Sequence, residues 1–424
     1  MDDFDPARHD VGRRSPFDLI FLDCEEIEGD VEGPGNNRHL TQMKLISIIC
    51  GLLFAISASF SGLLQAAESS FESLAEITSY RNQNLEAHPE LKAAFRRGFT
   101  IPGLSAGFVP QGMSPVPEEN ALVLSGYIWL SYKGFRKWKK VSKKRSVLLL
   151  VDADEGNLLS AALLRERSGA PMRRHAGGVQ VAGKSLWIPS KNKLYRFSFG
   201  SLLRARGELV ELSPLKVFAV DSKGSFVSGF GDFLLVGEFI KERDQVPAYH
   251  QSPSGKHNAW TALYRLERFN EADDSEQLFH QVSGKVLLRP DAVIHHRKKV
   301  QGLAVREDGW VVQSVSYGSK PSKLAFYQVL ENLGSPESWP GRTRLPNGFE
   351  VPSITLSGES NWQFTQSAPP GSEEVFWLDD DRLAFVFEGG AYPYREKWKE
   401  LEDRVLIFDL GAKLNQWLQS KQTN

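Results

Sequence analysis

The 424-residue chain has little cysteine and lacks several motifs of common redox and metal sites. It contains two cysteines, Cys24 and Cys50, and no CxxC, HExxH or GxGxxG motif. These absences argue against a thioredoxin-like redox centre, a zincin-type zinc protease and a Rossmann dinucleotide site. They do not exclude enzymes whose site residues are scattered over several repeats of one fold.

Long apolar runs are scarce as well, and the longest lies at residues 43–67. Lys44 stands at the beginning of this segment, no further charge occurs before Glu68, and small residues end the segment. This is the layout of a secretory signal peptide that starts at Met43. We therefore expect a cleaved signal and an extracytoplasmic protein, either periplasmic or secreted. A membrane anchor, which needs about 20 apolar residues, and a buried core helix are the alternatives.

The leader in front of this segment, residues 1–42, holds eleven acidic residues against four basic ones. Its proline, glycine and asparagine and its lack of an apolar period are typical of a disordered segment; a start-site misassignment is the alternative. Cleavage before Glu68 would remove both cysteines and change the formal net charge from −1 to +5. This excess is compatible with anionic ligands or surfaces but too small to predict nucleic-acid binding.

The remainder divides into a helical part and a β part. Phe71, Leu74 and Ile77 recur at helical spacing, so residues 69–98 are predicted to be helical and 68–107 to form an N-terminal extension. From residue 108 to 424, short alternating runs rich in Val, Leu, Phe and Tyr are separated by turn residues, which is typical of an all-β domain. A short helix is expected near residues 414–418.

Five repeated units fill the β part. Each opens with small or polar residues that lead into an apolar strand, and two further strands follow. The openings are PQGM at 110–113, AGGV at 176–179, GSFV at 224–227, VQGL at 300–303 and SEEV at 372–375. Repeated units of this kind predict a β-propeller. Residues 342–366 leave room for part of another unit, so we expect five to seven blades.

The run HAGGVQVAGKSLWIPSKNKLYRFSF, together with PQGM, VQGL and FEGGAYPYR, resembles blades of six-bladed propellers of the NHL and gluconolactonase-like group. As a whole, the chain from residue 108 onward resembles uncharacterised bacterial exported β-propeller proteins. The resemblance implies a propeller with six blades favoured. It implies the architecture only, because the metal-binding positions of gluconolactonase-like enzymes have no counterpart that can be assigned here.

Three segments match all or part of the consensus sequence of a known functional motif but lack other features that the motif requires. Residues 178–185 match the P-loop consensus, but strand-like residues stand where the loop and the following helix belong, so we predict a hairpin and expect no nucleotide. Residues 103–107 match the GxSxG nucleophile elbow but lack the strand before it and the helix after it. Residues 152–157 resemble the beginning of a calcium loop, lack its remaining ligands and are predicted to form a turn.

Polar residues stand at corresponding places where the units begin. They are Gln111, His175, Gln301 and Glu373, with Ser225 in the remaining unit. Inner strands of a propeller line a central channel, so we expect these side chains to converge at the channel mouth and bind a small polar ligand or a partner protein. Glu388 joins the set because two glycines follow it and permit close approach. The alternative is that a narrow, wet channel simply needs small or polar residues.

A metal-dependent hydrolase, lactonase-like or phosphoesterase-like, is the second functional hypothesis. His175 and Glu373 are competent ligands for a divalent metal and a competent acid–base pair, and Gln111 and Gln301 would assist them. Under this hypothesis a divalent metal is the cofactor, and its stoichiometric loss on His175→Ala would favour the enzyme.

A basic segment at residues 133–145 carries eight basic residues around Phe135 and Trp138. Basic and aromatic residues together suit an anionic polymer, phosphate groups or an acidic membrane surface; a solvated hairpin loop is the alternative. The candidates for such contacts are Lys137, Lys139, Lys140, Lys143 and Lys144. A second basic run, residues 295–299, is expected on the same face of the channel.

Overall fold

The structure is a computed structural model of the chain. It describes residues 71–75, 84–129, 144–271, 279–282, 284–329, 331–357, 362–395, 397–411 and 413–414. The chain divides into two units, residues 1–73 and 74–424, and all strands below belong to the second. The predicted leader and signal segment lie outside the described residues, as do residues 415–418 of the predicted C-terminal helix. No helix in the described part of the chain is long and apolar enough to cross a bilayer.

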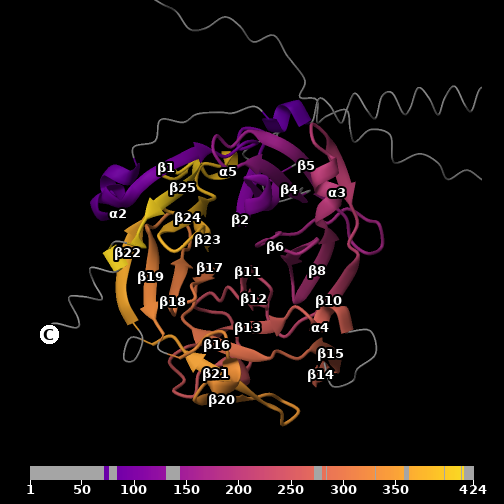
Figure 1. Ribbon diagram of the computed structural model, residues 1–424, viewed down its shortest axis with the longest axis vertical. Coiled ribbons are helices and arrows are strands. Elements are labelled where there is room, and N and C mark those ends of the chain that lie inside the picture. The colour runs from indigo at the N-terminus through magenta and orange to yellow at the C-terminus, as the bar shows by residue number, and fades with distance from the viewer. Residues whose placement is uncertain are drawn as a thin grey trace, which may run out of the picture. The chain divides into compact units, whose positions relative to one another are not determined.

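Five sheets in the described residues surround a common axis, and Figure 1 shows them in chain order around the ring. We number these blades 1 to 5. Blade 1 contains β2 (Phe108–Val116), β3 (Ala121–Trp129), β4 (Lys144–Asp152), β5 (Leu158–Leu164) and β9 (Leu209–Leu212). Blade 2 contains β6 (Gln180–Ala182), β7 (Ser185–Pro189), β8 (Lys193–Ser198) and β10 (Lys216–Ala219).

The other three blades are built in the same way from an inner strand outward. Blade 3 contains β11 (Phe226–Phe230), β12 (Phe233–Gly237), β13 (Ala259–Arg265), β16 (Ala292–His296), β21 (Glu350–Thr355) and β20 (Gly341–Arg344). Blade 4 contains β17 (Val300–Val305), β18 (Trp310–Val315), β19 (Ser322–Gln328) and β22 (Trp362–Ala368). Blade 5 contains β23 (Ser372–Trp377), β24 (Arg382–Phe387), β25 (Arg404–Asp409) and β1 (Phe95–Thr100).

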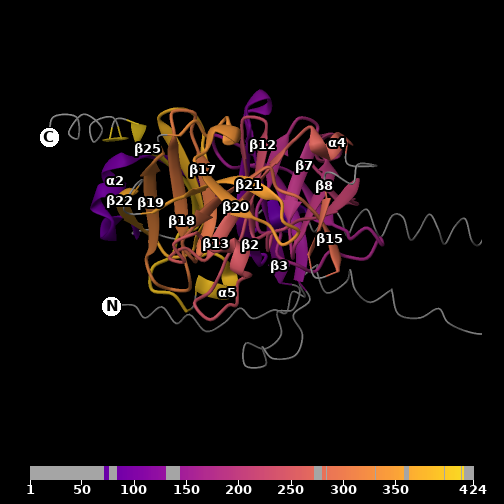
Figure 2. The ribbon, with the colours of Figure 1, turned by 90° about the horizontal axis from the view of Figure 1, so that it is seen from below.

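The predicted β-propeller is confirmed, and each predicted unit opening leads into the inner strand of one blade. Figure 1 shows these inner strands, β2, β6, β11, β17 and β23, nearest the centre of the ring. Five blades in the described residues lie within the expected range of five to seven, below the six that the resemblance favours. Figure 2 shows the same ring from the side.

Residues 342–366 do not begin a further blade. Strand β21 pairs in parallel with β16, and β20 pairs with β21, so both extend blade 3 outward. Strand β22 pairs with β19 and completes blade 4. The reason is that the outer edges of blades 3 and 4 present backbone N–H and C=O groups that these strands satisfy.

The predicted helix over residues 69–98 is wrong at its C-terminal end. Residues 71–75 and α2 (Pro89–Ala94) are helical, but the chain then extends into β1. Strand β1 pairs antiparallel with β25, with Phe95 opposite Phe408 and Thr100 opposite Arg404. Pairing with the otherwise open edge of the last blade outweighs the local helical pattern, and it closes the ring by joining an early strand to the final blade.

Apolar side chains fill the spaces between neighbouring blades. Phe326 of blade 4 and Phe385 of blade 5 belong to one buried cluster, and Leu148 of blade 1 and Leu186 of blade 2 belong to another. Sheets packed face to face in this way hold the inner strands in fixed positions. One hairpin and two short helices lie outside the blades. The hairpin joins β14 (Phe279–Val282) and β15 (Lys285–Leu288), and the helices are α3 (Phe199–Arg204) and α4 (Arg268–Glu271).

The three segments that match motifs of functional sites each contain a turn. Residues 178–185 contain β6 and the hairpin turn into β7, with Gly183 in the turn at a φ of 55°. Residues 102–107 are a run of turns that leads into β2. Residues 152–157 connect β4 and β5, with Gly156 at a φ of 78°, where glycine carries no steric cost.

Candidate functional site

A cavity of about 740 Å³ opens at the end of the propeller where the inner strands begin. Its walls include every residue that the sequence nominated for ligand binding: Gln111, His175, Gln301, Glu373 and Glu388, with Ser225 as well. The five come from blades 1, 2, 4 and 5, so the propeller brings together residues far apart in the chain. Their convergence is a fact of the structure, while their role in binding stays a prediction.

The topology of the blades explains why these residues meet. Because the first three strands of a blade are antiparallel, the beginning of its inner strand and the loop between its second and third strands lie at the same end. Those loops supply the other walls of the cavity: Lys191, Lys241, Tyr317, Tyr394 and Trp398. Sequence reasoning missed these residues, although this alternation was a signal that could have found them.

Four side chains form a hydrogen-bonded row along one wall. His175 Nδ1 lies 2.9 Å from Gln111 Oε1, and His175 Nε2 lies 2.8 Å from Lys144 Nζ. Gln111 Nε2 donates to Glu388 Oε2 at 3.2 Å. The amide oxygen can only accept and the ammonium can only donate, so His175 is neutral with its proton on Nδ1.

The charges around His175 agree with this protonation state. Burial, followed by the positive charges of Lys144, Lys191 and Lys241, lowers the pKa of His175 to about 4. Burial also lowers the pKa of Lys144 to about 8, although Glu388 attracts its charge. Lys144 Nζ lies 4.1 Å from the ring centroid of Tyr127, a cation–π contact. The cavity wall near His175 is therefore electropositive at neutral pH.

Two carboxyl groups lie on the wall contributed by blade 5. Glu373 is buried, and Gln301 Nε2 donates to its Oε1 at 3.0 Å. Burial, reinforced by the charges of Glu388 and Glu374, raises the pKa of Glu373 well above its usual range. Burial raises the pKa of Glu388 to about 7, against hydrogen bonds from Tyr394 and Gln111 and the charge of Lys144. At neutral pH Glu373 is a neutral acid that can donate a hydrogen bond, and Glu388 is close to its midpoint.

Aromatic side chains complete the walls. Tyr394 on α5 (Tyr392–Arg395) stacks with Trp398 at a centroid distance of 4.8 Å, and its hydroxyl lies 3.2 Å from that of Tyr127. Gly371 has a φ of 74° and lies beneath this pair; a β-carbon there would come within 2.7 Å of the Trp398 ring. A glycine is therefore required where the chain enters β23. Gly390, predicted from sequence to permit close approach, indeed lies against the backbone of Asp403.

The propeller axis beside the cavity is closed by glycines and one carboxyl group. A β-carbon at Gly112 of β2 would come within 2.4 Å of Gly178, and one at Gly302 of β17 within 2.8 Å of Glu374. A β-carbon at Gly178 would also come within 2.9 Å of the Glu374 carboxylate. Blades 2 and 5 are not neighbours, so the Glu374 side chain crosses the axis. Burial raises the pKa of Glu374 well above the usual range, against hydrogen bonds from the backbone of Val375 and Leu303.

The donor set does not fit the metal-dependent hydrolase. Among the described residues, no group of three or more His, Cys, Asp or Glu side chains is placed to hold a metal ion. Both ring nitrogens of His175 already face partners, and one partner is the Lys144 ammonium, which repels a cation. Glu373 faces Gln301 and is held in its neutral form, whereas a metal ligand has to be ionised.

The first predicted basic segment lies mostly outside the described residues. Lys137, Lys139, Lys140 and Lys143 lie outside the described residues, and Lys144 begins β4 beside His175.

In the run at 295–299, His295 and His296 are fully buried in β16 and do not face the channel. They are held inside blade 3 because His295 Nε2 lies 2.7 Å from Thr343 Oγ1 and His296 Nε2 lies 3.1 Å from Thr261 Oγ1. The residues that follow, Arg297–Lys299, line hollows at the surface.

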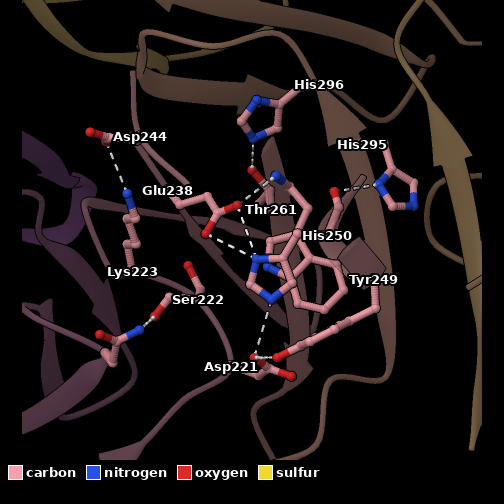
Figure 3. A network of polar contacts seen from close by, with 12 residues as sticks. Asp221, Ser222, Lys223, Glu238, Asp244, Tyr249, His250, Thr261, His295 and His296 are labelled. Atoms are coloured by element: carbon pink, nitrogen blue, oxygen red, sulfur yellow. Dashed lines mark hydrogen bonds and ion pairs between the residues drawn. The ribbon is translucent and has the colours of Figure 1, made fainter. Parts of the chain in front are cut away.

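A buried network lies next to the wall at residues 223–225, and Figure 3 shows its members Asp221, Glu238, Tyr249 and His250 pointing toward one another. Asp221 accepts from Tyr249 Oη at 2.9 Å and lies 2.7 Å from His280 Nε2 and 3.3 Å from His250 Nε2. His250 Nδ1 lies 3.2 Å from Glu238 Oε1. Two residues further along, Lys223 reaches the cavity, with its Nζ 3.0 Å from Asp244 Oδ2.

The Asp221 carboxyl is ionised despite its burial. Burial alone would raise the pKa of Asp221, but hydrogen bonds from His250 and His280 and their charge lower it to about 2. Burial alone would lower the pKa of His250, but Asp221 and Glu238 raise it. Removing one member would leave an unpaired buried charge, so we assign the network to positioning the cavity wall.

Comparisons with known proteins show no family and no function for this chain. No protein-family model and no curated protein matches the chain. Among solved structures, the PQQ-bound aldose sugar dehydrogenase of Streptomyces coelicolor has 17% sequence identity and a TM-score of 0.38. The match covers 74% of this chain and 97% of the dehydrogenase chain. The glutaminyl cyclase of Myxococcus xanthus has 8% identity and a TM-score of 0.35, covering 74% and 94%. BamB of Moraxella catarrhalis has 8% identity and a TM-score of 0.28, covering 71% and 85%. The dehydrogenase and BamB are β-propellers.

Proposed function

We propose that this propeller is a binding protein whose channel-mouth cavity holds a small polar ligand. The observation that carries the proposal is the convergence of Gln111, His175, Gln301, Glu373 and Glu388 on one space. A concave site of this size, with aromatic walls and a few placed polar groups, is what small-molecule sites share. A flat surface would suit a partner protein better than this cavity does.

Several features support binding over metal-assisted hydrolysis. The walls supply the amide oxygens of Gln111 and Gln301 and the buried carboxyl group of Glu373, which pair with hydroxyl groups of a ligand. The closed axis limits the ligand to the mouth, because Gly112, Gly178 and Gly302 bring the inner strands into contact. If residues 43–67 act as the expected signal, the ligand is met outside the cytoplasm.

A thermal-shift screen tests the proposal. The panel contains neutral and acidic monosaccharides, amino acids and dicarboxylates, each against wild type and the double variant Gln111→Ala/Gln301→Ala. We expect a binder at 100 times its Kd to stabilise wild type by about 2.7 kcal/mol, which is a rise of several degrees in Tm. The double variant should lose this rise relative to its own unliganded Tm.

Gln281→Ala is the matched control, because Gln281 is an exposed residue of the β14–β15 hairpin outside the cavity. It should keep the full ligand-induced rise. A rise that persists in the double variant would place binding elsewhere and contradict the proposal.

A further inference from the structure

The cavity continues sideways into a groove over blades 3 and 4. Tyr317 and Gly318 line both the cavity and an adjoining hollow of about 610 Å³. Arg297 and Lys299 line both that hollow and a third one of about 640 Å³. We call the two outer hollows together the basic groove. A ligand that fills the cavity can therefore extend along the basic groove.

The basic groove is strongly positive. Its walls contain six basic residues, Lys256, Arg297, Lys298, Lys299, Lys320 and Lys323. Among the described residues of these walls, Glu242 is the one acidic residue, and it has an oxygen 2.9 Å from Lys299 Nζ. In the cavity itself, Lys191 and Lys241 contribute to the lowered pKa of His175, so the positive potential extends from the groove to the cavity wall. Clefts lined by one sign of charge attract ligands of the other.

Two of these lysines are held in a backbone conformation that lysine disfavours. Lys191 has a φ of 51° and Lys299 a φ of 66°. In the described part of the chain, the other non-glycine residues with positive φ are Asn120 and Asn192, and asparagine tolerates this region well. Strain of this kind clusters at binding sites. Lysine side chains are thus presented at the cavity and at the groove, where asparagine or glycine would relax the backbone.

The junction between cavity and groove has an aromatic surface between two ammonium groups. Tyr317 is 52% exposed, and its ring centroid lies 5.6 Å from Lys241 Nζ and 5.8 Å from Lys299 Nζ. A uronic-acid unit has matching parts, an apolar ring face and a carboxylate at the ring edge. Inside the cavity, the amides of Gln111 and Gln301 and the acid of Glu373 match the hydroxyl groups of a sugar.

A lipid surface matches less well. Binding to a bilayer combines basic residues with apolar side chains that enter the interface. The exposed large apolar side chains of the described residues are Leu215, Val286, Tyr317 and Phe349, and only Tyr317 lines the groove. A deep cavity at the end of a groove also suits a chain terminus better than it suits a membrane.

We propose that the ligand is an acidic oligosaccharide of the uronate class, with its terminal sugar in the channel-mouth cavity and the carboxylates of the following units along the basic groove. This inference rests on the proposed function and adds the ligand class to it. The cavity supplies the contacts to hydroxyl groups, and the groove supplies the charge.

Calorimetric titration with α-1,4-linked tetragalacturonate tests the proposal. The matched ligand is the fully methyl-esterified tetramer, which has the same backbone without the charge. We expect the ester to bind wild type at least about tenfold more weakly, and binding of the acid to weaken with added salt, because the groove contributes through charge.

The variant Lys320→Glu/Lys323→Glu changes exposed lysines of the groove only. It should bind the acidic tetramer at least about tenfold more weakly than wild type, by the reversal of two charges beside the ligand. The control Lys184→Glu/Lys285→Glu makes the same change of charge at exposed residues outside the cavity and the groove. It should bind within about twofold of wild type, since distant surface charges are screened. Thermal unfolding confirms that both variants fold.

Four outcomes would overturn the inference. They are equal binding of acid and ester, unchanged binding by the groove variant, equal binding of a hexaglutamate peptide, and binding of phosphatidylserine vesicles without binding of the tetramer. If the tetramer fails while a neutral compound still stabilises wild type and not Gln111→Ala/Gln301→Ala, the ligand class is wrong and the proposed function stands.

Discussion

At the residue scale, burial sets the protonation states that define the cavity. The Glu373 carboxyl stays neutral because burial and two neighbouring acids disfavour its charge, and the Glu388 carboxyl, with a pKa of about 7, changes charge in the physiological range. His175 stays neutral because burial and three lysines lower its pKa to about 4. The site therefore presents hydrogen-bond donors and acceptors inside a positive field, and only Glu388 adds a variable negative charge.

The affinity for tetragalacturonate should depend on pH through Glu388. The raised pKa means that Glu388 is mostly neutral at pH 6 and mostly ionised at pH 7.5, where it repels the uronate carboxylates. We expect binding to be about threefold weaker at pH 7.5 than at pH 6, which corresponds to a tenfold penalty for the ionised form. Calorimetry at the two pH values measures this difference in affinity. Both pH values lie below the pKa of Lys144, about 8, so Lys144 keeps most of its charge at both.

Glu388→Gln is the matched variant for this dependence. It keeps a side chain of the same shape that is neutral at both pH values, so its affinity should be nearly the same at pH 6 and pH 7.5. The interpretation of Glu388 fails if the variant retains the threefold change or if wild type shows none.

At the scale of elements, local patterns predicted the strands of each blade but not the strand that closes the ring. Alternating apolar residues identified β17, β18 and β19 because their partners are neighbours in the chain. Most of strand β1 lies within residues 69–98, which were predicted as helix from the helical spacing of Phe71, Leu74 and Ile77, and its partner β25 lies at the other end of the chain. The loop residues Lys191 and Tyr317 belong to no motif, so only the alternation of antiparallel strands could have placed them at the cavity.

Closure by β1 can be tested at Gly98. A β-carbon there would come within 2.5 Å of the carbonyl oxygen of Val405 in β25, so Gly98→Ala should force the strands apart. We expect a loss of about 1–3 kcal/mol in the free energy of unfolding, the usual cost of overpacking. Urea-induced unfolding measures the change.

Gly200→Ala controls for the glycine-to-alanine change itself. Gly200 lies in α3, and the nearest group to an added β-carbon is the end of the flexible Arg204 side chain. Alanine in a helix should be neutral or stabilise by up to about 1 kcal/mol. Equal stability of the two variants would contradict the account of β1 as a tightly paired closing strand.

At the scale of the whole molecule, the ring is what turns scattered polar residues into a site. Gln111, Gln301 and Glu373 occupy equivalent places in three blades, and this equivalence let the sequence predict that they meet. The closed axis was not predictable, because it depends on contacts between inner strands of different blades, such as Gly178 against Glu374. Neither were the blade count and the outward extension of blade 3, which depend on which sheet edges β20, β21 and β22 satisfy.

The central claim is that the channel-mouth cavity is the ligand site. A crystal structure of the protein with bound tetragalacturonate, or with the strongest stabiliser from the thermal-shift panel, tests it most directly. The account predicts electron density for the ligand between Gln111 and Gln301, within hydrogen-bonding distance of Glu373 or Glu388. Density for the ligand elsewhere on the propeller, with the cavity filled only by water, would contradict it.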